Sequence, residues 1–374
     1  MGLFEDFDKV SHQDWMDKIT LDLKGKDFQE TLVWNSNEGV DVQPFYNGSS
    51  TASTPLKKSN DWKIRETITI QSIKEANKKA LLALKGGANS ILFIGEVKDQ
   101  SEMNGLLEDI QTNIIDINFY TPNFNKTLSL SSLTDGSISY DFLGEYFISG
   151  NWNNSKENDI EELAKITSSA NNVKTITVKN SSNSTIVQEL AISLSQAVEY
   201  FNLLTDKGIE ANRIASKIQF EFSIGTNYFF EIAKIRAARN LWQSILKGYE
   251  VKDTPMIIHS ETSVEQNSKE DKNYDLLRNT TKAMSAVIGG CDSLTVNAHD
   301  TTEKNIDFSN RIARNIHHIL KEEAFFDKVN NPADGSYYIE ELTDEVAKKS
   351  WKLFQEMEKQ GGFLKCVENG FIKR

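Results

Sequence analysis

Helices and short apolar strands alternate along most of this chain, and this alternation constrains its fold more than any other feature. Apolar residues at helical spacing predict helices over 73–87, about 101–111, 158–169, 184–206, 227–247 and 272–288. Runs of β-branched and aromatic residues predict strands over 90–94, 117–120, 174–178, 218–222, 256–258 and 293–296. Such alternation is typical of crossover units and a parallel sheet. Six or seven units favour an α/β fold of the closed (β/α)8 TIM-type barrel over an open sheet, and we expect residues 61–374 to form it as one domain.

Residues 1–60 have a different pattern and are expected to form an N-terminal extension, an arm and a linker. The pattern predicts a helix from Ser11 to Leu23, a short strand over Thr31–Trp34 and a polar linker over 47–60. The arm, residues 1–46, carries many large apolar side chains: Phe4, Phe7, Trp15, Phe28, Trp34 and Phe45. A solvated tail rarely has so many, so the arm is expected to dock on another subunit. The alternative is that it folds back on its own barrel.

Composition excludes several classes of partner. The chain has 374 residues and a formal net charge of −12, which disfavours nucleic acid and anionic membranes. No apolar run reaches the length of about 20 residues that a membrane span needs. The two cysteines, Cys291 and Cys366, fit a reducing compartment, and the acidic N-terminus does not resemble a signal peptide. We therefore expect a cytoplasmic protein.

Polar residues follow several predicted strands, at the end of a barrel where catalytic groups lie. His259 and Glu261 follow 256–258 and could form an acid–base pair, or only hydrogen-bond within their loop. Ser181 and Ser182 lie just beyond 174–178, and Asn297 follows 293–296. His299-Asp300 has no third metal ligand at useful spacing, so no metal is expected. The sequence also lacks a phosphate-binding glycine loop, a zinc-type cysteine pair and a G-x-S-x-G nucleophile motif.

The segment 311–338 joins a charged helix to a turn and contains a histidine pair. Adjacent residues of a helix point about 100° apart, so His317 and His318 cannot jointly bind a metal. Asn331-Pro332 and Asp334-Gly335 are typical of turns. This segment is therefore expected to be scaffold.

The same segment is part of a wider resemblance. RIARN…ILKEE…KVNNPxDGS resembles the signature of the methylmalonyl-CoA mutase family, and further matching stretches occur in the family's order over nearly the whole chain: DLKGKDFQETLVW (22–34), EGVDVQP (38–44), NYFFEIAKIRAARNLW (227–242), HSETS (259–263), AMSAVIGGCDSLTVNAHD (283–300) and GSYYIEELTDEVAKKSW (335–351). The resemblance implies a barrel threaded by coenzyme A. It also implies radical isomerisation of acyl-CoA with adenosylcobalamin, which a second domain binds through Asp-x-His-x-x-Gly. Some members are heterodimers of one catalytic and one non-catalytic chain.

This chain departs from the catalytic members at the expected mouth of the barrel. After Ile-Arg they have Gln and a catalytic Tyr, where this chain has Glu66 and Thr67. Ser181 and Ser182 stand roughly where they have Tyr-His, and Glu261 replaces a Gln. None of the five histidines lies in the cobalamin motif, so no cobalamin-binding domain is expected in this chain. A serine can replace neither a histidine as an acid nor a tyrosine as an aromatic wall.

These departures imply the non-catalytic small (beta) subunit of a heterodimeric member, with a structural role. Its expected partner is a catalytic (alpha) subunit that holds adenosylcobalamin and interconverts methylmalonyl-CoA and succinyl-CoA, and the arm is expected to contact that subunit. No residue is then expected to be catalytic, and the chain alone binds no cofactor. The mouth positions become vestigial: Thr67, Ser181, Ser182, His259, Glu261 and Asn297. The alternative is an active acyl-CoA mutase, or another CoA-dependent barrel isomerase, with altered site residues.

Overall fold

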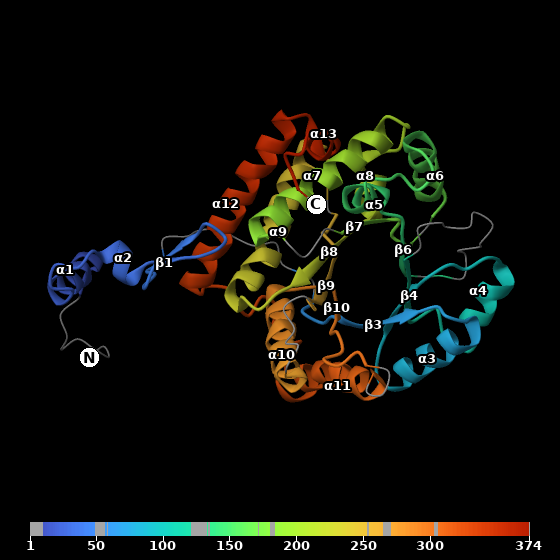
Figure 1. Ribbon diagram of the computed structural model, residues 1–374, viewed down its shortest axis with the longest axis horizontal. Helices are drawn as coiled ribbons and strands as arrows, with labels where there is room; N and C mark the ends of the chain where they lie inside the picture. Colours follow the sequence, from blue (N-terminus) through green and yellow to red (C-terminus); the bar gives the residue numbers. More distant parts are fainter. Residues whose placement is uncertain are drawn as a thin grey trace.

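Eight parallel strands form the centre of the molecule in the computed structural model (Figure 1). It describes residues 10–48, 57, 59–120, 133, 135–170, 172–179, 184–252, 254–264, 271–302 and 306–373. In chain order the strands are β3 Lys63–Thr69, β4 Ser90–Ile94, β5 Asp116–Tyr120, β6 Gly136–Ser139, β7 Ile176–Lys179, β8 Ile218–Ile224, β9 Ile258–Thr262 and β10 Ser293–Thr295. Each pairs in parallel with its neighbours in the order β6-β5-β4-β3-β10-β9-β8-β7.

The two ends of this order also meet, which closes the barrel. A parallel bridge joins Ser137 of β6 to Lys174 just before β7. The Ile138 amide donates to the Lys174 carbonyl at 2.8 Å, and the Lys174 amide donates to the Gly136 carbonyl at 2.9 Å. The predicted (β/α)8 TIM-type barrel is therefore confirmed.

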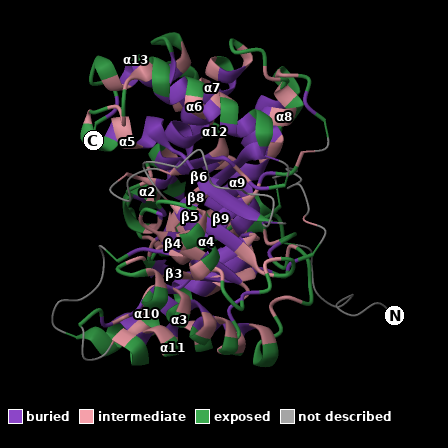
Figure 2. Cartoon of the chain, turned by 90° about the vertical axis from the view of Figure 1, so that its right-hand side faces the viewer, coloured by how far each residue is buried: buried purple, intermediate pink, exposed green. Residues whose placement is uncertain are grey.

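Helices surround the strands, as the alternation predicts. They are α3 Ile73–Lys85, α4 Gln100–Leu106, α5 Phe142–Ser149, α6 Lys156–Ser169, α7 Ile186–Thr205, α8 Ala211–Lys217, α9 Tyr228–Gly248, α10 Lys272–Gly289, α11 Ile306–His318 with the π-helical turn η1 Ile319–Glu323, α12 Tyr337–Lys359 and α13 Gly362–Glu368. Figure 2 shows buried residues along the central strands and exposed residues on the outer helix faces. None of the helices in the described residues is long and apolar enough to cross a membrane.

Two local predictions need correction. The strand predicted at 256–258 is β9, which runs from Ile258 to Thr262 and so includes polar residues assigned to a loop. The strand predicted at Thr31–Trp34 is wrong, because α2 covers Phe28–Leu32 and only Trp34–Asn35 forms a strand, β1. The stretch 121–157, for which no order was predicted, contains β6, α5 and the start of α6.

The N-terminal arm has an outer and an inner part. The outer part, α1 (His12–Asp22) and α2, projects from the barrel (Figure 1), and neither helix has a buried residue. The inner part is the hairpin of β1 and β2 (Asp41–Val42), where Val40 and Val42 are buried in the barrel's own core cluster. The prediction that the whole arm packs on another subunit is therefore wrong for this hairpin. For the outer part it stays a prediction.

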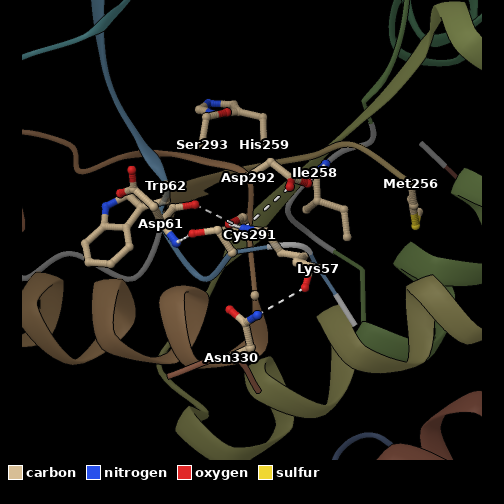
Figure 3. Close-up of polar contacts among 12 residues, drawn as sticks. Lys57, Asp61, Trp62, Met256, Ile258, His259, Cys291, Asp292, Ser293 and Asn330 are labelled. Atoms are coloured by element: carbon tan, nitrogen blue, oxygen red, sulfur yellow. Dashed lines mark hydrogen bonds and ion pairs between the residues drawn. The ribbon is translucent and has the colours of Figure 1, made fainter. Parts of the chain in front are cut away.

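Linker residue Lys57 is tied to the N-terminal end of the barrel (Figure 3). Its ammonium donates to the Cys291 carbonyl at 2.6 Å and lies 3.5 Å from the Asp292 carboxylate. That carboxylate also accepts the Ile258 amide at 2.7 Å and Arg239 at 2.9 Å. The end of the linker therefore helps to fasten the strands that start here.

The two adjacent histidines have separate structural partners, as expected for scaffold. The Trp62 indole donates to Nδ1 of His317 at 3.0 Å, and His318 hydrogen-bonds the Gly86 carbonyl at 2.9 Å. Burial, then the charge of Lys321, lowers the pKa of His317 to about 3. His317 is therefore a neutral acceptor.

Candidate functional site

The interior of the barrel is polar. Along β8, for example, apolar side chains that face the outer helices alternate with polar side chains that face inward. In β8, Phe220 packs on Trp242 of α9 outside the barrel. The preceding residue, Gln219, donates instead to Thr177 of the neighbouring strand at 2.7 Å. Successive side chains of a strand point to opposite faces, so the polar member of each pair lines the interior.

Arg65 forms the centre of one interior layer. Its Nε donates to the Ser90 hydroxyl and its Nη2 to the Asn118 side-chain carbonyl, both at 3.1 Å. The Ser137 hydroxyl donates to the same Asn118 oxygen at 2.8 Å. Arg65 is only 7% exposed, and burial lowers its pKa to about 10. One buried guanidinium, charged at neutral pH, thus links three strands directly and a fourth, β6, through Asn118.

His259 lies on the next interior wall and is also fully engaged. Its Nδ1 is 2.8 Å from the Ser293 hydroxyl, and its Nε2 is 3.4 Å from the Thr295 hydroxyl. Burial, then the charges of Arg65 and Lys179, hold the pKa of His259 well below its usual range. A neutral, buried imidazole with a neighbour on each nitrogen is a structural group in this state.

A charged cluster lies nearer the C-terminal ends of the strands. Lys179 of β7 pairs with Glu221 of β8 and lies 3.7 Å from Glu261 of β9. The Asn297 amide donates to Glu261 at 3.0 Å and to the Thr262 carbonyl at 2.6 Å. Burial, then the charge of Glu221, raises the pKa of Glu261, and Lys179 opposes this shift. The cluster has one cation between two carboxylates.

His259 and Glu261, for which the sequence left open an acid–base pair or local hydrogen bonds, have separate partners. Both residues lie within β9, and no hydrogen bond between the described residues joins His259 to Glu261. His259 contacts Ser293, whereas Glu261 is held by Asn297 and Lys179. Of the two readings left open by the sequence, the structure shows no direct pair, because each side chain is bonded to a neighbouring strand.

Other predicted site residues are dispersed. Thr67 and Asn297 line a small cavity of about 50 Å³ between β3, β10 and α11. Ser181 and Ser182 lie outside the described residues. Asp300 is bonded by Lys272 at 2.5 Å and by the Thr302 amide at 3.0 Å. The described residues contain no group of three side chains suited to a metal.

Sequence reasoning missed Lys179, Glu221 and Asp141. Asp141 follows β6 and accepts from Tyr200 at 2.7 Å and from the Gly144 amide at 3.0 Å, and burial raises its pKa to about 7. The signal for Glu221 was present, since polar and aromatic residues alternate in the β8 sequence IQFEFSI. That pattern indicates a strand with one polar face.

The profile of the methylmalonyl-CoA mutase family matches residues 115–374. The methylmalonyl-CoA mutase small subunit of Porphyromonas gingivalis is 36% identical, with 100% of this chain and 66% of that protein covered. The small subunit of Streptomyces virginiae is 26% identical over 100% of this chain and 67% of its own length. The large subunit of the same Porphyromonas strain is 38% identical, over 50% of this chain and 26% of that protein.

Proposed function

This chain belongs to the methylmalonyl-CoA mutase family, and we propose that it is the non-catalytic small subunit of a heterodimeric mutase. In this proposal the partner is a catalytic large subunit that binds adenosylcobalamin and interconverts methylmalonyl-CoA and succinyl-CoA. The chain spans 66% of the length of its Porphyromonas relative, so the activity and partner of the whole protein are part of the proposal. The cytoplasmic location of this chain is also part of the proposal, and its support is the two buried free cysteines.

The main support for the proposal is that the polar side chains inside the barrel are buried and hydrogen-bonded to one another. The Arg65 layer is buried, and its members hydrogen-bond to one another rather than facing an open channel. His259 is buried in the same way and keeps a neutral imidazole. A chain that held an acyl-CoA along its axis would have to break these bonds and leave buried polar groups unpaired, at about 1–3 kcal/mol each.

The residues present do not fit cobalamin. A histidine that binds cobalt needs an accessible ring nitrogen. His259 and His317 are buried and engaged, and His318 is bonded to the Gly86 carbonyl. His12 stacks on Trp15 and His299 lies half-buried beside Phe308, but neither has an Asp two residues before it as the cobalamin motif requires. These observations support the proposal that the cofactor binds to the partner chain and that this chain takes no step of the radical reaction.

The relatives support a two-chain assembly. One Porphyromonas strain has both a small and a large subunit of methylmalonyl-CoA mutase, and this chain resembles both. The outer part of the arm provides a contact surface, because Leu21 is 72% exposed on a helix that buries none of its residues. Burial of one such side chain contributes roughly 1.5–3 kcal/mol before ordering costs.

The alternative is an active isomerase with altered residues, and the cluster of Lys179, Glu221 and Glu261 favours it. Carboxylates with a raised pKa can transfer protons. In this structure Lys179 pairs with Glu221, and Asn297 fixes Glu261. The cluster is therefore better explained as a charge-balanced part of the barrel wall.

The test uses the purified full chain, alone and mixed with a catalytic large subunit. Alone, it should give no saturable change in the adenosylcobalamin spectrum and no turnover of methylmalonyl-CoA. It should co-purify with the large subunit at a one-to-one ratio. A variant that lacks residues 1–32 keeps the hairpin and the buried Val33, and it should bind the large subunit more weakly. Turnover by the isolated chain, abolished by Glu261→Gln, would establish the alternative.

A further inference from the structure

A polar cavity lies beneath the arm hairpin, at the rim of the barrel. Its volume is about 430 Å³, within the range of small-molecule sites. The hairpin contributes Trp34, Asn37 and Glu38 to the wall. The ends of β8 and β9 contribute Ser223 and Ser263, and the first turns of α7 and α9 complete it. Trp34 is held against Phe230 of α9 in an edge-to-face contact at 6.0 Å, so the hairpin covers this cavity.

The charges in the wall do not balance. Lys234 lies 2.8 Å from Glu189 and 2.7 Å from Glu231, and Glu38 is a third carboxylate. Among the side chains that line the cavity, three carboxylates therefore face one ammonium, while Lys282 behind the wall donates to the Ser263 carbonyl at 2.7 Å. One oxygen of Glu38 accepts the Ile186 amide at 2.6 Å. Its other oxygen has no hydrogen-bond partner among the described residues.

A second, independent observation is the hydroxyl of Ser263. The residue lines the cavity, is only 8% exposed, and its Oγ has no hydrogen-bond partner in the described part of the chain. Buried hydroxyls are normally bonded, and an unmade bond costs about 1–3 kcal/mol. A ligand that can donate to this oxygen would remove that cost. The amide of Asn227 adds a further polar group, since it makes no capping bond to α9.

We propose that this cavity binds a small organic diamine. Its two ammonium groups would donate to the lining carboxylates and to the Ser263 hydroxyl, because ammonium groups donate to such oxygens. The face of Trp34 adds a favourable surface for a cation. No metal-type group exists among the described residues, whereas an ammonium ion needs only separate acceptors. This site goes beyond the proposed role in the mutase and does not depend on it.

The probe is 1,4-diaminobutane, and its matched control is 1,4-butanediol, which has the same length without charge. Calorimetric titration of the full chain at pH 7 and low salt should show saturable, one-to-one binding of the diamine and none of the diol. Ser263→Ala should weaken diamine binding about ten-fold, as expected for loss of a hydrogen bond to a charged group. Glu38→Gln should weaken it at least as much.

A chain of charge −12 attracts cations at many surface sites, so a control within the protein is needed. Ser309 is also buried with an unpartnered hydroxyl, but it does not line this cavity. Ser309→Ala should bind the diamine like the unchanged chain. Equal binding by the Ser263 and Ser309 variants, equal binding of diol and diamine, or no saturable binding at millimolar diamine would each overturn the proposal.

Discussion

Lys234→Met should destabilise the isolated chain more than any exposed substitution on the same helix. Lys234 is 1% exposed and contacts two buried carboxylates, Glu189 and Glu231, and the Ser223 carbonyl at 2.5 Å. Methionine keeps much of the side-chain volume but leaves two buried anions without a cation. Removal of one partner from a buried ion pair costs about 3–5 kcal/mol. Unfolding entropy of about 2.1 cal/mol/K per residue over 374 residues converts this to a melting temperature about 4–6 °C lower.

The stability lost in Lys234→Met should depend on pH, and the direction of this dependence follows from the two buried carboxylates. Burial already raises the pKa of Glu189 in the unchanged chain, although Lys234 opposes the shift. Without the cation the pKa rises further, so the variant is penalised increasingly as pH rises above the unfolded value of about 4.3. The deficit should therefore be larger at pH 7.5 than at pH 5.5.

Thermal and urea unfolding at these two pH values measure the effect. Lys247→Met, at an exposed position of the same helix, is the matched control and should stay within about 0.5 kcal/mol. A second variant, Glu189→Gln with Lys234→Met, should recover part of the loss because one anion is removed. A deficit below about 1 kcal/mol, or one that does not change with pH, would refute the reasoning.

Three further outcomes are expected. Because Cys291 and Cys366 are buried, and burial raises the pKa of the Cys291 thiol to about 12, a thiol reagent should label neither in the folded chain and both after unfolding. Gly136→Ala should lower the free energy of unfolding in urea by at least about 3 kcal/mol, because at φ +119° the new Cβ would lie 1.9 Å from the Ile117 carbonyl oxygen. Its control is Gly335→Ala, at φ +76° with nothing nearby, which should lower the free energy of unfolding by only about 1–2 kcal/mol. Leu21→Asp should leave the melting temperature of the isolated chain unchanged but weaken its co-purification with the large subunit.

The sequence predicted strands best where a single polar inward residue, such as Ser90 or Asn118, lies within an otherwise apolar run. The run 90–94 was assigned to its observed bounds, and 117–120 differs from β5 by one residue. β9 was misplaced because its sequence after Ile258 reads HSET. The side chains of those residues that point inward are polar, because the interior of this barrel consists of hydrogen-bonded polar groups instead of an apolar core. A pattern search that weighs hydrophobicity therefore ends the strand too early.

The partners of the site residues could not be predicted in the same way. Lys179, Glu221 and Glu261 are about 40 residues apart along the chain, and only the parallel register places Lys179 opposite Glu221. Alternation within one strand indicates which residues share a face, but not which strand lies beside it. The neighbours of His259 and Glu261 depend in the same way on the register between β9 and its two neighbouring strands. The sequence thus identified polar residues at the barrel mouth without identifying their pairs.

The arm shows how one segment can belong to two structures. Val40 is 2% exposed in the barrel core, and Glu38 caps the first turn of α7 through the Ile186 amide. Removal of the hairpin would therefore take away core volume and a helix cap, and a loss of complex after such a deletion would not identify a subunit contact. The outer helices bury no residue, so their removal should leave the barrel intact. A weaker complex after that shorter deletion can be assigned to the arm's contact with the partner, because the fold that presents the arm would be unchanged.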